Sequence, residues 1–123
     1  MPRLRRRLLL PAMIAAGALS MYLLYPILAL DGPGGLIFPI LSWPDTYYSS
    51  GFSHRKFLKI TAGMSKSEVE DLLGPPLATY FVQGTGETGW KYSDTRNDSS
   101  YYARVVLFVD GKVTRRLSEF YVD

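Results

Sequence analysis

The hydrophobic positions of the chain fall into two parts with different patterns. Residues 8–30 contain no charged side chain, and 19 of these 23 residues are apolar. At about 1.5 Å per residue, a helix of this length extends roughly 34 Å, which is enough to cross a bilayer core of about 30 Å. The pattern therefore predicts an N-terminal transmembrane helix.

Charged residues flank this apolar segment asymmetrically. Asp31 follows it, and four arginines precede it: Arg3, Arg5, Arg6 and Arg7. Because positive charge is retained on the cytoplasmic side of a membrane, the amino terminus is expected in the cytoplasm and the rest of the chain outside. The sequence thus predicts a single-pass protein of the cytoplasmic (inner) membrane with its C-terminal domain outside, in the periplasm where a second membrane exists.

A cleaved signal peptide is the main alternative for this segment. Ala16-Gly17-Ala18 is an acceptable small-x-small cleavage site. The apolar run continues well beyond Ala18, however, and exceeds the roughly 7 to 15 residues of a typical signal-peptide core. Lipoprotein processing requires a cysteine, and the chain has none. An uncleaved signal-anchor is therefore favoured, and the inner membrane is favoured over the outer membrane or secretion.

Residues 31–54 are interpreted as a juxtamembrane linker. The run Asp31-Gly32-Pro33-Gly34-Gly35 interrupts the helix, and the apolar residues 36–43 are too few to span a membrane. Two interpretations of residues 36–43 remain open: they lie at the outer membrane interface, or they pack on the folded domain. The serines and glycine of residues 49–53 predict a flexible connection.

From residue 55 onward the pattern is that of a small α+β domain. Ser65 and Glu68 form a capping box that starts a helix, and an apolar stripe of Val69, Leu72 and Leu73 follows it. Gly74 and two prolines end that helix. A helix this short is unstable alone, so the stripe is expected to dock on a sheet.

Four segments have the aromatic and β-branched composition of strands, namely residues 77–83, 89–93, 101–109 and 112–122. Asp110-Gly111 predicts a tight hairpin between the last two. The predicted fold is therefore α+β: a transmembrane helix in residues 1–30, a linker in 31–54, and a domain in 55–123. That domain has one or two short helices packed on a three- to four-stranded antiparallel sheet.

The strand at 101–109 has two distinct faces. One is wholly apolar and is expected to face the helix; it contains Tyr101, Ala103, Val105, Leu107 and Val109. The other is mixed and is expected to stay open, because helices cover one side only. With one residue of the first strand it forms the predicted interaction surface: Tyr80, Tyr102, Arg104, Val106 and Phe108. Residues 36–43 or a second copy of the chain are the alternative cover for this face.

Composition and charge narrow the function classes. The net charge of +3 comes from the four N-terminal arginines, since the remaining chain has 10 basic and 11 acidic residues, so nucleic-acid binding is not expected. With no cysteine and His54 alone, the chain lacks the partners for a thiol nucleophile, a catalytic triad or a histidine- or cysteine-based metal site. Neither an enzyme nor a cofactor, metal or small-molecule substrate is predicted.

Three local motifs have simple structural interpretations. Residues 84–89 match the dinucleotide-binding pattern GxGxxG, but a strand and not a helix follows them, which predicts a glycine-rich hairpin loop. His54 is expected to be solvated. Arg55, Lys56 and Lys59 are either solvated or in contact with lipid phosphates.

The sequence of residues 57–76, FLKITAGMSKSEVEDLLGPP, resembles the helix region of the SmpA/OmlA family of bacterial outer-membrane assembly lipoproteins, typified by BamE. The aromatic strand with Trp90 and Tyr92 and the later strand ending in Val109-Asp110-Gly111 follow in the same order. The resemblance covers roughly residues 55–116. The missing lipidation cysteine is a departure from the family pattern.

The resemblance implies a small α+β module that binds proteins at the cell envelope. We therefore predict a membrane-anchored, non-enzymatic protein-binding module, an accessory or scaffold in envelope or outer-membrane protein assembly, whose partner is an envelope protein. The alternative is a small inhibitor that blocks an exported enzyme, since the β-lactamase inhibitory proteins contain a similar fold.

Overall fold

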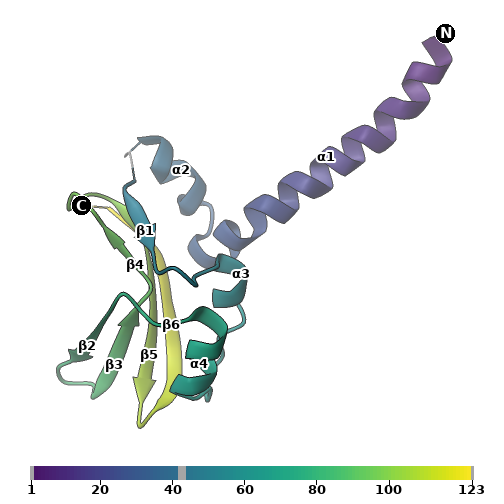
Figure 1. Cartoon of the computed structure of the whole chain (residues 1–123). Coiled ribbons are helices and arrows are strands. Elements are labelled where there is room, and N and C mark those ends of the chain that lie inside the picture. Colours follow the sequence, from purple (N-terminus) through teal and green to yellow (C-terminus); the bar gives the residue numbers. More distant parts are fainter. Residues whose placement is uncertain (1, 42–43, 123) are drawn as a thin grey trace.

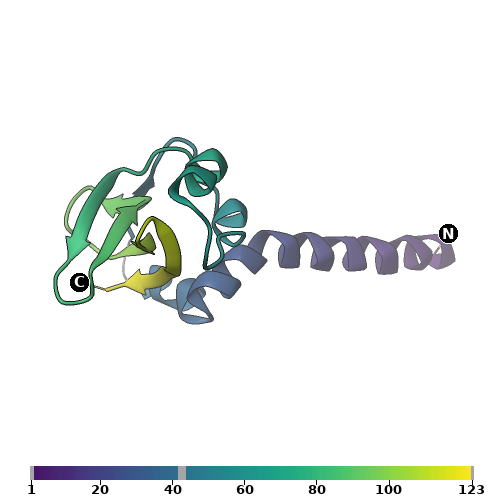
Figure 2. The ribbon, with the colours of Figure 1, turned by 90° about the horizontal axis from the view of Figure 1, so that it is seen from below.

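A 30-residue helix, α1 (Pro2–Asp31), extends away from a small α+β domain in the computed structural model (Figures 1 and 2). The structure describes residues 2–41 and 44–122, with side chains from residue 8 onward. All side chains from Leu8 to Tyr25 are exposed, and burial begins at Pro26. The segment Leu8–Asp31 is long and apolar enough to cross a membrane or to serve as a signal sequence.

Four antiparallel strands form the main sheet in the order β2–β3–β5–β6. Their bounds are Ala78–Val82 for β2, Glu87–Lys91 for β3, Tyr101–Val109 for β5 and Lys112–Tyr121 for β6. Asp110 and Gly111 join β5 to β6 with positive φ angles of 50° and 73°, as a two-residue hairpin turn requires. The predicted hairpin and antiparallel sheet are confirmed.

The glycine-rich motif forms the loop between β2 and β3. Gly84 and Gly86 have positive φ angles of 89° and 71°, and Gly89 lies inside β3. The chain continues from this loop as a strand, so the loop does not lead into the helix that a phosphate-binding site of this pattern requires.

Two short helices cover one face of the sheet: α3 (His54–Phe57) and α4 (Lys66–Leu73). The capping box is present, with the Ser65 hydroxyl accepting from the Glu68 N–H at 3.1 Å and the Glu68 carboxylate accepting from the Ser65 N–H at 2.7 Å. The hydrogen bond from the Ser65 backbone N–H lowers the pKa of Glu68. Val69 and Leu73 are fully buried, as the apolar stripe predicts.

Residues 46–53 differ from the expected flexible linker. Strand β1 (Thr46–Tyr48) pairs antiparallel with β4 (Ser93–Thr95), and the Ser49 N–H donates to the Tyr92 carbonyl at 3.0 Å. Phe52 stacks on Tyr48 with ring centroids 4.9 Å apart. The sequence did not predict this structure because serines and glycine are typical of a flexible linker, whereas the packing comes from Tyr48 and Phe52 beside and between them.

The break at Gly32-Pro33 is followed by a second helix, α2 (Gly34–Leu41), which crosses the direction of α1 (Figure 1). Gly35 is buried, and Phe38 stacks on Phe120 of β6 at 6.1 Å. One side of residues 36–41 thus packs on the domain. Trp43, which the interface interpretation also invokes, lies outside the described residues.

The core lies between the helices and the mixed face of β5, so the predicted assignment of the two faces is wrong. Val106 and Phe108 are 0% and 1% exposed and belong to one apolar cluster. Its other buried members are Leu30, Phe57, Ile60, Val69, Leu73, Trp90, Tyr92 and Val113. The sequence prediction took the polar groups of Arg104 and Tyr102 as signs of an exposed face. In the structure these groups are paired within the chain, because Arg104 binds Asp31 at the end of α1 and Tyr102 binds Gly35 in α2.

Candidate functional site

A buried ion pair joins the end of α1 to the sheet. The Arg104 guanidinium donates to both carboxylate oxygens of Asp31 at 2.7 and 2.6 Å, and both side chains are 0% exposed. Arg104 also donates to the Ala103 carbonyl at 2.8 Å. Since the C-terminal end of a helix carries partial negative charge, a carboxylate there needs a nearby cation, and Arg104 provides it.

Two further hydrogen bonds hold the same region of the backbone. The Tyr102 hydroxyl donates to the Gly35 carbonyl at 2.5 Å, and the Ser118 hydroxyl donates to the Leu30 carbonyl at 2.8 Å. Leu30 itself is 7% exposed and belongs to the core. The last turn of α1 is therefore part of the folded domain, which differs from the predicted boundary at residue 30.

Helix α3 contacts α1 about two turns earlier. The Arg55 guanidinium lies 3.6 Å from the centroid of the Tyr22 ring, and it donates to the Tyr22 carbonyl. Such a cation–π contact and a charge-assisted hydrogen bond together fix the side of α1 that faces the domain. The helix and the domain are thus joined at Tyr22 and again at Leu30 and Asp31.

His54 lies beside this junction and is not the solvated side chain that the sequence suggested. Its ring makes edge contacts with Tyr48 and Phe52, both at 5.1 Å between centroids. Burial, aided by the positive charge of Arg104, lowers the pKa of His54 to about 4. Burial raises the pKa of Tyr48 to about 12. Both side chains are therefore uncharged at neutral pH.

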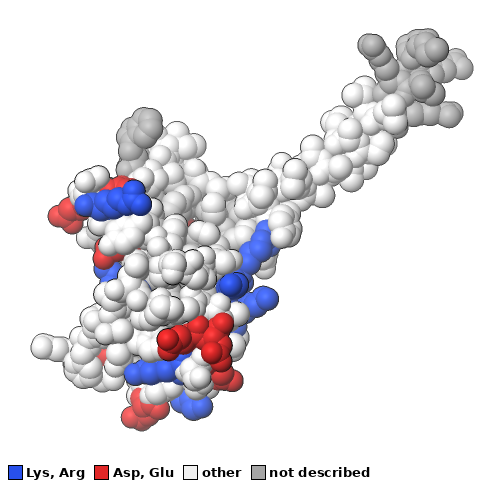
Figure 3. All heavy atoms as spheres, viewed as in Figure 1, with Lys and Arg blue, Asp and Glu red and all other residues white. Residues whose placement is uncertain are grey.

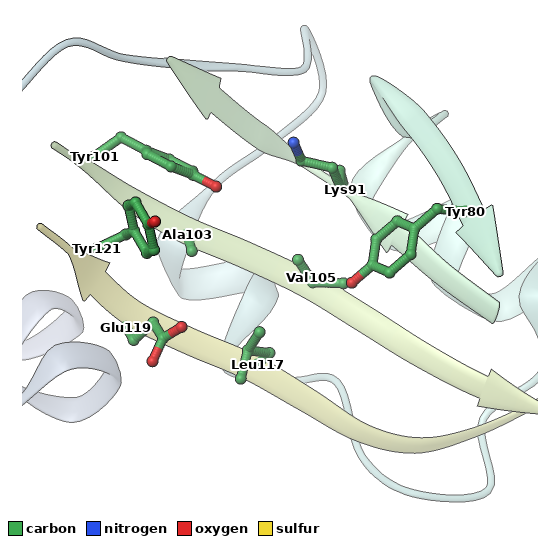
Figure 4. Close-up of a pocket in the computed structure, with 8 residues that line it drawn as sticks. All are labelled: Tyr80, Lys91, Tyr101, Ala103, Val105, Leu117, Glu119 and Tyr121. Carbon is green, nitrogen blue, oxygen red and sulfur yellow. The ribbon is translucent and has the colours of Figure 1, made fainter. Parts of the chain in front are cut away.

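The sheet face opposite the helices carries a hollow of about 470 Å³ (Figure 4). Small and branched side chains of β5 and β6 form its floor: Ala103, Val105 and Leu117. Tyrosines and two charged groups surround that floor: Tyr80, Lys91, Tyr101, Glu119 and Tyr121. Its size falls within the range of small-ligand pockets, but its apolar floor and aromatic walls also suit a protruding side chain of a protein.

Tyr80 forms one end of this hollow and depends on Gly89 for its position. The two residues pair across β2 and β3, and a Cβ atom at position 89 would lie 2.3 Å from Cζ of Tyr80. The tyrosine ring therefore lies directly over the glycine. At the other end, Tyr101 and Tyr121 pair across β5 and β6 with ring centroids 5.6 Å apart.

The charges near the hollow are only partly compensated. Lys91 is bonded to Asp94 at 2.8 Å, whereas no ion pair within the described residues involves Glu119. Beyond the hollow, Glu87 accepts from Arg115 at 3.2 Å, and this hydrogen bond lowers the pKa of Glu87. Glu119 is thus the acidic group of the hollow that is available to a partner.

The structure separates the five residues predicted as an interaction surface. Tyr80 lines the hollow, but Tyr102, Arg104, Val106 and Phe108 lie on the opposite face, under the helices and α2. The seven lining residues that the sequence prediction missed are Lys91, Tyr101, Ala103, Val105, Leu117, Glu119 and Tyr121. The Asp110-Gly111 turn could have found the tyrosine pair, because counting outward from the turn brings residue 101 near residue 121.

The site offers no clear metal-binding arrangement. Among the residues that the structure describes, no group of three histidine, cysteine, aspartate or glutamate side chains is close enough to hold a metal ion.

Comparisons with family models, with curated proteins and with solved structures gave no match to this chain.

Proposed function

We propose that the chain is a membrane-anchored, non-enzymatic protein-binding module of the bacterial cell envelope, with its domain on the outer side of the cytoplasmic membrane. The observation that carries this proposal is the placement of one apolar helix and one open aromatic face on the same small domain. Leu8–Tyr25 leave the domain with every side chain exposed, and the hollow lies on the sheet face that the helices do not cover.

The surface of α1 supports the anchor. Exposed leucine, isoleucine, methionine and tyrosine side chains cover it from Leu8 to Tyr25, and water is a poor solvent for so large an apolar surface. In the view of Figure 3 its described atoms are uncharged, and Lys or Arg atoms are seen where it meets the domain. The arginines at positions 3–7 favour a cytoplasmic amino terminus and an external domain.

The open face supports protein binding. Tyrosines around an apolar floor are typical of the residues that carry most of the binding energy in protein interfaces. The order of elements, two short helices followed by antiparallel strands, agrees with the resemblance to the SmpA/OmlA family, although a fold alone does not determine function. An accessory or scaffold role in envelope protein assembly is the specific form of the proposal.

Site-specific photo-crosslinking in intact membranes tests this proposal. We would place a photo-reactive phenylalanine analogue at Tyr121 of the full chain, which lines the hollow and is 48% exposed, and at the control position Asp71 on the exposed side of α4. An envelope protein attached from position 121 and not from position 71 is the expected result. Equal attachment from both positions, or attachment only to cytoplasmic proteins, would overturn the proposal.

A further inference from the structure

Helix α2 presents an apolar face away from the domain. Ile37, Ile40 and Leu41 are 55%, 80% and 75% exposed. Their spacing of three and four residues places them on one side of the helix. Phe38, which is 45% exposed, also stacks on Phe120, and Gly35 is buried. The helix is uncharged throughout.

The position of α2 relative to α1 is fixed. The Gly35 N–H donates to the Gly32 carbonyl at 3.2 Å and the Leu36 N–H to the Pro33 carbonyl at 3.1 Å, so α2 begins within the turn that ends α1. The Gly35 carbonyl accepts the Tyr102 hydroxyl. Figure 1 shows α2 running across the direction of α1, beside the place where α1 leaves the domain. The exposed apolar face thus lies on a helix that begins where α1 ends.

The length of α1 indicates where this second apolar surface lies. The charged Arg55 side chain lies on Tyr22, and a guanidinium belongs at the level of the lipid headgroups. The part of α1 that leaves the domain with every side chain exposed runs from Leu8 to Tyr25, which is 18 residues or about 27 Å. This is close to a bilayer core of about 30 Å, so the outer end of this segment lies in the headgroup region together with Arg55. An interfacial helix buries its apolar face about 5 to 10 Å into the headgroup boundary, and α2, which begins where α1 ends, is placed beside that boundary.

The charges around α2 suit a lipid surface as well. Asp31, at the junction of the two helices, is neutralised by Arg104 and is not exposed. Arg55 and the exposed Lys56 follow on α3, on the neighbouring side of α1. Basic side chains at this level are attracted to anionic lipid headgroups.

We propose that α2 lies in the outer interfacial layer of the membrane, with Ile37, Ile40 and Leu41 against the lipid chains and Arg55 and Lys56 at the level of the phosphates. This inference rests on the proposed role of α1 as the membrane anchor. The domain then contacts the membrane through two helices, and its orientation on the membrane surface is fixed.

Spin-label accessibility in the full chain tests this inference, and the absence of cysteine makes each introduced thiol unique. We would label three single variants, Ile14→Cys in α1, Ile40→Cys in α2 and Thr85→Cys in the β2–β3 loop, in vesicles of phosphatidylethanolamine and phosphatidylglycerol. Oxygen, which concentrates in lipid, and a water-soluble nickel chelate then report the depth of each label. Position 14 reports on the anchor, and position 85 is the aqueous control.

The expected result is that positions 14 and 40 collide preferentially with oxygen and position 85 with the nickel chelate. If position 14 is in lipid and position 40 is in water, the inference is wrong while the anchor stands. If position 14 is also in water, the anchor and the inference both fail. Spectral broadening at position 40 that disappears on dilution with unlabelled chain would identify a second copy as the cover of α2, and would also overturn the inference.

Discussion

At the scale of single residues, the pair of Asp31 and Arg104 determines how the chain is assembled. The two residues are 73 positions apart, and their fully buried side chains join the end of α1 to the sheet. Removing one partner of a buried ion pair leaves the other charge without compensation in a poorly hydrated place. Loss of either side chain alone is therefore expected to destabilise the folded chain strongly.

We expect Asp31→Asn to lower the free energy of unfolding of the full chain in detergent micelles by about 3–5 kcal/mol, because Arg104 then remains buried and unpaired. Asp94→Asn is the matched control, since it breaks a partly exposed pair with Lys91, and such pairs contribute about 0–1 kcal/mol. Denaturant titration followed by circular dichroism measures both. Equal effects of the two substitutions would contradict the role assigned to Asp31.

The contact between Gly89 and Tyr80 gives a second prediction. Gly89→Ala places a methyl group inside the space of the tyrosine ring, and because this exposed ring can move away, we expect a loss of no more than about 1 kcal/mol in the free energy of unfolding. The double variant Tyr80→Ala with Gly89→Ala removes the clash, and the two effects should not add in a double-mutant cycle. Additive losses would show that the ring does not lie over the glycine.

His54 predicts a pH dependence of stability. Its pKa is lowered to about 4 in the folded chain, so between about pH 6.5 and 4 the unfolded chain binds more protons and stability falls as the pH falls. Glu68, Glu87 and Asp94 also have lowered pKa values, but these change the free energy of unfolding mainly near and below about pH 4.

Unfolding midpoints measured between pH 5 and 7 test this dependence. His54→Asn should reduce the slope in that range, because the asparagine does not titrate. An unchanged slope in this variant would show that another group causes it.

At the scale of elements, the start and the end of α4 are determined by residues of the helix and its caps, Ser65 with Glu68 at one end and Gly74 at the other. Ser65→Ala removes the acceptor for the Glu68 N–H, and loss of such a cap costs about 1 kcal/mol. Ser67→Ala, at an exposed position of the same helix, is the control and should change stability by no more than about 0.5 kcal/mol. Chemical denaturation of both variants tests the cap, and a loss at Ser67 as large as that at Ser65 would contradict it.

The elements that the sequence predicted well are those with local signals. The capping box, the glycine that ends α4 and the Asp110-Gly111 turn all act within a few residues, and the structure contains each of them. The composition of the segments and the alternation of their side chains also located the four strands of the main sheet. They could not determine which face of β5 is covered, because that depends on the distant partner of Arg104 in α1.

The same limit explains why the hollow was missed. Its walls come from β2, β3, β5 and β6, and only the register of all four strands brings Tyr80, Lys91 and Glu119 to one face. Strand β1 was missed for a related reason. Three residues carry little periodic signal, and β1 forms because β4 offers a pairing edge.

At the scale of the whole molecule, the apolar helix and the domain form one connected structure. The end of α1 contributes Leu30 to the core and Asp31 to a buried ion pair, and α2 carries a second exposed apolar surface. The domain is therefore not suspended from a flexible linker. In this arrangement, an anchor in the membrane also sets the direction in which the open sheet face points.

The most direct test of this account is the membrane topology of the full chain. We would treat intact spheroplasts with a membrane-impermeant maleimide, using Thr85→Cys in the β2–β3 loop and Pro2→Cys at the amino terminus. We expect position 85 to be labelled in intact spheroplasts and position 2 to be labelled only after lysis. Labelling of position 85 only after lysis would place the domain in the cytoplasm and contradict the account.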